Sequence, residues 1–238
     1  MAKENPLASN LTLEQQKNLF GNAYLNMLWH CPTDQRFPYW VHLPDCYYDE
    51  KDPHYKLLVI IHGTGCAVED YVRHAKELAD RDHVAVLAPL FPGGLIQRDD
   101  FNSYKLLSCD GVRYDQILLD MIDDMAKRYP GVETDKFFLF GHSGGGQFAN
   151  RFLFAHPEKL RACAIGAPGR PTFLNPDEDY FWGTRDFKNY FGHDVDLAAV
   201  QKVPVLVIVG ENDTKFIGDS PYGDNRVARM KSLQKNLQ

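Results

Sequence analysis

The chain has 238 residues, of which 44% are hydrophobic and 24% are charged, proportions that are typical of a soluble globular protein. The formal net charge is −6, and the Lys and Arg residues are scattered along the chain. This argues against a nucleic-acid-binding protein, which needs a basic surface to neutralise phosphates. The length suits one α/β domain with a sizeable core.

Targeting signals and cysteine usage indicate where the protein works. The N-terminal residues contain no apolar run followed by small residues, so they predict no signal peptide. The longest apolar runs, 57–61 and 203–209, are far too short to span a bilayer. The five cysteines are widely spaced and form no C-x-x-C pair, which favours reduced thiols over disulfides or a zinc site. We therefore expect a cytoplasmic protein without membrane contact.

Short apolar strands alternate with amphipathic helices along the chain. This alternation predicts an α/β fold with a mostly parallel sheet that helices cover on both faces. We expect strands at 37–43, 56–61, 84–88, 136–140, 160–165 and 203–209. We expect helices at 69–81, 115–129 and 147–155, and a further helix from about residue 226.

The last two expected strands are separated by residues 168–201, which are rich in aromatic residues, Pro and Asp. Such a segment is longer than a normal crossover and predicts a small cap or lid inserted in a single domain, 1–238. Its aromatic rings either enclose an apolar or aromatic substrate group or pack the cap onto the body. Arg170, Arg185 and Lys188 either select an anionic substrate or are ordinary exposed charges.

A G-x-S-x-G motif at 141–145 lies between an expected strand and an expected helix. A serine hydroxyl is a weak nucleophile unless it is exposed, aligned and next to a base. A sharp strand-to-helix turn exposes the hydroxyl, and glycines on either side relieve the crowding. The helix that follows directs its N-terminal amides at developing negative charge. The motif predicts that Ser143 is a nucleophile; a tight glycine turn without catalytic function is the alternative.

Two further segments complete the expected site. His62, Gly63, Thr64 and Gly65 end the strand at 56–61, where a backbone amide can face the substrate oxygen. The N–H groups of Thr64 and Gly144 are the expected oxyanion hole, unless this loop is an ordinary turn. We expect His62 itself to be a hydrogen-bonded structural residue.

Asp213 follows the last expected strand and the turn 210–212. A carboxylate in this position can orient a histidine and stabilise its charged form, so Asp213 is the expected triad acid. Glu211 and Asp219 are substitutes for this role, and a polar loop carboxylate is the alternative for Asp213.

From residue 37 to the C-terminus the chain resembles the α/β-hydrolase superfamily, in particular its single-domain serine esterase and peptidase-like branch. The resemblance rests on the motifs 62–65, 141–145 and 210–213 in this order. It implies Ser-His-Asp hydrolysis of an ester, thioester or amide bond through an acyl-enzyme. No nucleotide-binding glycine motif and no cluster of metal ligands occurs in the sequence, so we expect neither a cofactor nor a metal.

The sequence departs from this pattern at the histidine. Superfamily members place it after one more strand beyond the acid, but all nine histidines here precede Asp213. Either the chain is a shortened version without the last strand, or it is naturally short and noncatalytic or served by another base. His193, in the expected cap, is the candidate base among the existing histidines; otherwise it is an exposed loop residue.

Three functions remain open. The first is a serine hydrolase that acts on a small ester-like molecule. The second is a noncatalytic binding module that retains the pocket, and the third is a lyase or carbon–carbon hydrolase on the same scaffold. A missing last strand is expected to expose a sheet edge and to favour a homodimer.

Overall fold

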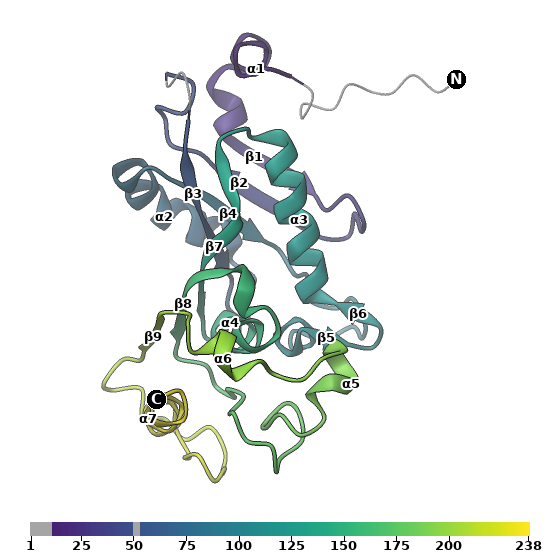
Figure 1. The fold of residues 1–238 in the computed structure, drawn as a ribbon, viewed down its shortest axis with the longest axis vertical. Coiled ribbons are helices and arrows are strands. Elements are labelled where there is room, and N and C mark those ends of the chain that lie inside the picture. The colour runs from purple at the N-terminus through teal and green to yellow at the C-terminus, as the bar shows by residue number, and fades with distance from the viewer. Residues whose placement is uncertain (1–10, 50–52) are drawn as a thin grey trace.

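The computed structural model describes residues 11–49 and 53–238, and a seven-stranded sheet forms its centre (Figure 1). The strand order is β1-β2-β4-β3-β7-β8-β9. The pairs β4–β3, β3–β7, β7–β8 and β8–β9 are parallel, whereas β1–β2 and β2–β4 are antiparallel. The strands are β1 Asn26–His30, β2 Pro38–His42, β3 Tyr55–Ile61, β4 Val84–Pro89, β7 Val132–His142, β8 Leu160–Gly166 and β9 Val205–Ile208. β5 Ser108–Cys109 and β6 Val112–Arg113 form a separate hairpin.

The helices connect these strands and follow the last one. They are α1 Leu13–Phe20, α2 Val68–Asp82, α3 Tyr114–Arg128, α4 Gly144–Ala155, α5 Phe187–Phe191, α6 Leu197–Val200 and α7 Arg226–Asn236. The 3-10 turns are η2 Gly21–Leu25, η3 Ser103–Leu106 and η4 Pro157–Lys159. Within the described ranges, none of these helices is long and apolar enough to cross a membrane.

Side chains of the central strand β3 point alternately to the two faces of the sheet, as the period of a strand requires. Leu57, Val59 and Ile61 join the larger core, together with apolar residues of α3 and α4. Leu58 and Ile60 pack in the smaller core, which α2 covers. The structure therefore confirms the predicted α/β architecture, with a mostly parallel sheet and helices on both faces.

Several boundaries differ from the sequence expectations. Helix α4 begins at Gly144, not at residue 147, because tertiary contacts around the glycines outweigh their low helix propensity. Strand β7 is longer than expected, since its polar first residues still pair with β3. Strand β9 is shorter and begins after Pro204, which has no N–H to donate to a sheet. The sequence analysis missed β1, which pairs with β2 and alternates between exposed and half-buried residues.

Residues 168–201 cross from β8 to β9 on the side of α4 (Figure 1). Phe173, Phe187 and Phe191 of this segment are buried in the main core. The Tyr180 hydroxyl donates a hydrogen bond to the carbonyl oxygen of Leu106 in η3. Most of these aromatic rings therefore attach the segment to the body, which was one of the two interpretations. Its action as a cap or lid stays a prediction.

Candidate active site

Ser143 occupies the sharp turn between β7 and α4, called the elbow below, which is the turn that the sequence motif predicts. Its backbone has φ 56° and ψ −111°, a positive-φ conformation outside the αL region that is costly for a residue with a side chain. The Ser143 N–H donates a hydrogen bond of 2.8 Å to the carbonyl oxygen of Gly166, at the end of β8. This bond holds the strained turn against the neighbouring strand.

The glycines of the motif are required by close contacts between backbones. A β-carbon on Gly141 would overlap the carbonyl oxygen of Gly145, across the turn. One on Gly145 would overlap the carbonyl oxygen of Ile61, at the end of β3. One on Gly146 would overlap the carbonyl oxygen of Gly166. The first turn of α4 therefore lies directly on the ends of β3 and β8, and this contact fixes the position of Ser143.

The loop after β3 lies beside the serine. The nitrogen of Thr64 is 3.1 Å from the position that a β-carbon would take on Gly144. A β-carbon on Gly63 would lie 3.8 Å from the Ser143 β-carbon. Gly144 is the first residue of α4, so its N–H has no acceptor within the helix. The structure thus brings Ser143, Thr64 and Gly144 together, at the N-terminal end of a helix.

Hydrogen bonds to the ring and backbone of His62 hold this loop in place. The Phe91 N–H donates a 3.0 Å hydrogen bond to His62 Nε2, so Nδ1 carries the proton and donates to the Gly63 carbonyl oxygen at 2.7 Å. Burial lowers the pKa of His62 to about 4, so its ring is neutral at pH 7. The Tyr104 hydroxyl donates to the His62 carbonyl oxygen at 3.0 Å. Both ring nitrogens are occupied, which agrees with the structural role expected for His62.

Asp213 follows β9 and a turn closed by its own N–H, which donates to the Gly210 carbonyl oxygen at 3.0 Å. Its carboxylate forms a 3.2 Å ion pair with Arg226, the first residue of α7. The structure therefore pairs the expected triad acid with a guanidinium group. No hydrogen bond joins Ser143 Oγ to a histidine in ranges 11–49 and 53–238.

His193 lies at the other end of α4. It is exposed, its Nδ1 is 3.0 Å from the Asp194 carbonyl oxygen, and it lines a surface cavity together with Ala155 and His156. Helix α4 has 12 residues and begins at the elbow. At 1.5 Å per residue, this places its C-terminal end about 17 Å from Ser143. The structure does not bring His193 to the serine.

A histidine–aspartate pair that sequence reasoning missed also lies at this distal end. His156 Nε2 is 2.8 Å from Asp115 Oδ2, and Arg113 donates two further hydrogen bonds to the same carboxylate. Burial raises the pKa of Asp115, but the hydrogen bonds from Arg113 and His156 outweigh it and lower the value to about 2. Asp115 and His156 are 41 residues apart in unrelated contexts, so no sequence motif links them.

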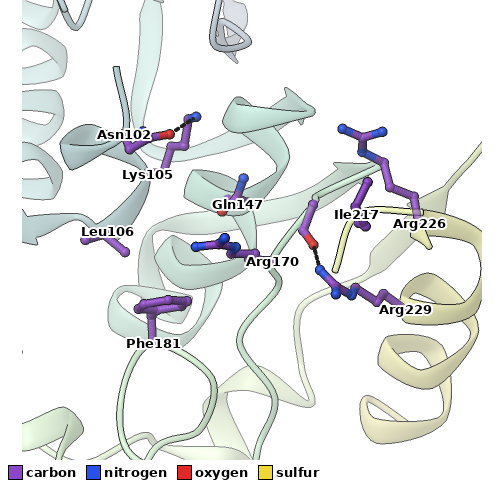
Figure 2. Close-up of a pocket in the computed structure, with 10 residues that line it drawn as sticks. Asn102, Lys105, Leu106, Gln147, Arg170, Phe181, Ile217, Arg226 and Arg229 are labelled. Carbon is purple, nitrogen blue, oxygen red and sulfur yellow. Dashed lines mark hydrogen bonds between the residues drawn. The ribbon is translucent and has the colours of Figure 1, made fainter. Parts of the chain in front are cut away.

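A cavity of about 360 Å³ borders the serine end of α4 (Figure 2). It contains four basic side chains, of which the sequence analysis had singled out Arg170 alone. Figure 2 shows Lys105, Gln147 and Arg170 on one side and Ile217, Arg226 and Arg229 on the other. The complete lining is Asn102, Lys105, Leu106, Gln147, Gly169, Arg170, Phe181, Ile217, Arg226 and Arg229.

The described part of the chain shows no metal-binding arrangement. No group of three or more His, Cys, Asp or Glu side chains gathers there in a way that would hold a metal ion. The five cysteines are all free thiols.

Comparisons with known proteins bear on the fold. No protein-family model and no curated protein matches the chain in sequence. Among solved structures, the chain is similar to a poly(aspartic acid) hydrolase-1 from Sphingomonas sp. KT-1, with a TM-score of 0.70 and 19% identity over 89% of this chain and 83% of that chain. It is equally similar to a poly(3-hydroxybutyrate) depolymerase from Bordetella parapertussis, with a TM-score of 0.70 and 19% identity over 98% of this chain and 83% of that chain.

A third similar structure is an S-formylglutathione hydrolase from Agrobacterium tumefaciens, with a TM-score of 0.56 and 15% identity over 89% of this chain and 82% of that chain. Identities this low establish the fold and not the substrate. Together with the strand order and the elbow at Ser143, they show that this chain has the α/β-hydrolase fold.

Proposed function

We propose that this chain is a serine hydrolase that cleaves an ester, thioester or amide bond through an acyl-enzyme on Ser143. The observation that carries the proposal is the strained backbone of Ser143 at a strand-to-helix turn, with the Thr64 nitrogen against Gly144. A conformation that costs of order 1–3 kcal/mol persists where the surrounding structure enforces it, and such conformations cluster at active sites.

In the proposed reaction, Ser143 Oγ attacks the carbonyl carbon of the substrate and loses its proton to a base. The carbonyl π electrons move to oxygen, and the resulting oxyanion accepts hydrogen bonds from the N–H groups of Thr64 and Gly144. Collapse of this intermediate re-forms the carbonyl and expels the alcohol, thiol or amine, which takes up the proton. Water then attacks the acyl-enzyme, releases the acid and restores the serine. In this proposal Asp213 is the triad acid, and the base remains unassigned.

A second candidate function is a binding module that holds an ester-like ligand without turnover. It is supported by the absence of a histidine partner for Ser143 Oγ in the described ranges and by the ion pair between Asp213 and Arg226. A serine without a base retains only the contributions of binding and of the oxyanion hole, which are about 10³- to 10⁴-fold over water.

Labelling with a neutral fluorophosphonate probe separates the two functions. We expect covalent labelling of the folded wild-type chain at Ser143, located by peptide mass spectrometry, and none in Ser143→Ala. Ser108→Ala, a half-buried serine in β5, is the matched control and should label like wild type. Absence of labelling in a correctly folded wild-type chain would reject the hydrolase and favour the binding module.

Turnover is tested separately. On mixing with 4-nitrophenyl acetate, we expect a burst of nitrophenol and a mass increase of one acetyl group on Ser143. A burst without further release would mean that the serine acylates but that deacylation lacks an efficient base.

A further inference from the structure

The cavity beside Ser143 concentrates positive charge in a protein whose net charge is −6. Lys105 brings one of these charges close to Ser143, since its Cε is 2.8 Å from the position of a β-carbon on Gly144. Gln147, one helical turn beyond Ser143 on α4, also lines the cavity. The cavity therefore adjoins the first turn of α4, next to Ser143.

Lys105 is buried at this place without a counter-ion. Its side chain is 6% exposed, and its amine donates one hydrogen bond of 2.6 Å, to Asn102 Oδ1. An ammonium group has three donors, and no carboxylate in the described ranges forms an ion pair with it. Burial is the main cause that lowers the pKa of its amine; the charges of Asp100 and Cys66 raise it, and those of Arg151 and Arg170 lower it by smaller amounts. The free donors of Lys105 are available to a ligand in the cavity.

Two buried arginines hold segments that line the cavity, and one of them, Arg229, lines it itself. Arg151, which is fully buried, donates to the carbonyl oxygens of Lys105 at 2.6 Å and of Arg170 at 2.7 Å. It thereby holds the two segments that carry these cations. Arg229, 1% exposed, donates to the carbonyl oxygens of Gly169 and Gly218, each at 2.5 Å. The hydrogen-bond acceptors of both guanidinium groups are neutral oxygen atoms. The positive charges of the two arginines are therefore not neutralised by these bonds.

The balance of charge around the cavity is strongly positive. Of the five cations Lys105, Arg151, Arg170, Arg226 and Arg229, only Arg226 has a carboxylate partner within the described ranges, namely Asp213. The other four form no ion pair with a carboxylate there, and the nearest negative charges are those of Asp100 for Lys105 and Asp224 for Arg229. Removing a charge from water without a partner costs several kcal/mol, and a cavity lined by one sign of charge attracts the opposite sign.

We propose that this cavity binds an anionic oxygen group of the substrate, so that the bond cleaved at Ser143 belongs to an acid-bearing ester, thioester or amide. The assignment of the cleaved bond rests on the proposed hydrolase function, whereas the anion site itself does not. Lys105 and Arg170 are the residues that contact the anion. Phe181, Leu106 and Ile217 line the remaining wall and face the carbon chain between the anion and the carbonyl.

The test uses binding to the Ser143→Ala variant, which is independent of turnover. Calorimetry compares monomethyl glutarate with methyl glutaramate, which has the same shape and a neutral amide in place of the carboxylate. We expect the anionic ester to bind at least about tenfold more tightly, which corresponds to about 1.4 kcal/mol. Raising the salt concentration should reduce this preference. Inorganic phosphate, as a second probe, shows whether the site prefers phosphate to carboxylate.

Single substitutions identify the residues that cause the preference for the anionic ester. In the Ser143→Ala background, Lys105→Met and Arg170→Gln should each remove most of the difference between the two esters. Lys188→Gln removes the same charge from an exposed position on α5 outside the cavity and should leave the difference intact. Arg170 is exposed, so Arg170→Gln keeps the test valid even if Lys105→Met fails to fold.

The outcomes distinguish the two proposals. Equal binding of the two esters, or an equal effect of Lys188→Gln and Arg170→Gln, overturns the anion site, even if the neutral fluorophosphonate labels Ser143. Preference for the anion without any labelling of wild type supports the anion site and rejects the hydrolase. Protection of Ser143 from the probe by monomethyl glutarate, but not by methyl glutaramate, supports the anion site next to the serine.

Discussion

The two ends of helix α4 differ in how completely their polar groups are satisfied. At the N-terminal end, Ser143 has a strained backbone, and the buried amine of Lys105 uses one of its three donors. At the C-terminal end, the buried carboxylate of Asp115 accepts hydrogen bonds from His156 and Arg113 with normal lengths. Unsatisfied or strained groups persist in folded proteins chiefly where function requires them.

The comparison shows that a histidine–aspartate pair does not by itself mark a catalytic site. In the described part of the chain, the distal end contains a histidine–aspartate pair, whereas the serine end contains the proposed nucleophile, Ser143, without such a pair. The guanidinium of Arg113 also lies 5.2 Å from the ring centre of Phe191 in α5. Arg113, which bonds to Asp115 of the distal pair, therefore connects residues 168–201 to α3 and to the end of α4. We interpret this as a structural role of the distal pair.

The largest expected effect is the loss of stability when the distal pair is broken. Asp115→Asn leaves Arg113 and His156 without their anionic partner, and breaking a buried ion pair in this way costs about 3–5 kcal/mol. Chemical denaturation should show this loss of unfolding free energy. Below the melting temperature, labelling of Ser143 should proceed at the wild-type rate. If the variant is stable but no longer labelled, the distal pair contributes to the serine site and the comparison fails.

A smaller effect is expected from removing one amide at the serine end. Thr64→Pro eliminates the N–H next to Gly144, and the loss of one oxyanion-hole donor slows a reaction by roughly 100- to 1,000-fold, or about 3–4 kcal/mol. Thr64→Ala keeps the N–H and is the matched control. The rate of fluorophosphonate labelling measures both variants, after circular dichroism has shown that they are folded. Equal rates for the two variants would remove Thr64 from the oxyanion hole.

The fold was predictable because most of its strands are apolar runs that end at glycine, proline or charged residues. Strand β3 and the elbow after β7 follow this rule, and local sequence suffices to locate them. Strand β1 was missed because Met27, Leu28 and Trp29 belong to a half-exposed strand that is stabilised by pairing with β2. Such a strand depends on a distant partner and leaves little local pattern.

The cationic cavity was not predictable for a similar reason. Lys105 and Arg229 are 124 residues apart, in η3 and in α7, and only the folded sheet brings their segments together. In the sequence, each of these basic residues resembles an ordinary surface charge. Arg170 was recognised as a candidate anion-binding residue, whereas the buried Lys105 was not, because burial cannot be inferred from residue type when charged side chains are mostly exposed.

The two ends of α4 should also lose stability in different ranges of acid pH. The pKa of His62, in the loop beside the serine, falls from 6.5 to about 4 on folding, so the unfolded chain binds more protons between these values. The stability that neutral His62 contributes is complete above pH 6.5 and is lost as the pH falls to about 4, by about 3 kcal/mol. Asp115, at the distal end, falls from 3.8 to about 2, and its contribution of about 2 kcal/mol is lost between these values.

Denaturation at a series of pH values measures both effects. His62→Gln should flatten the pH dependence of stability between pH 6.5 and 4 and leave the lower range unchanged. Asp115→Asn should do the reverse, flattening the range from pH 4 to 2. If either variant flattens both ranges, the two ends of α4 are energetically coupled, and the distal pair acts on the serine through the helix that joins them.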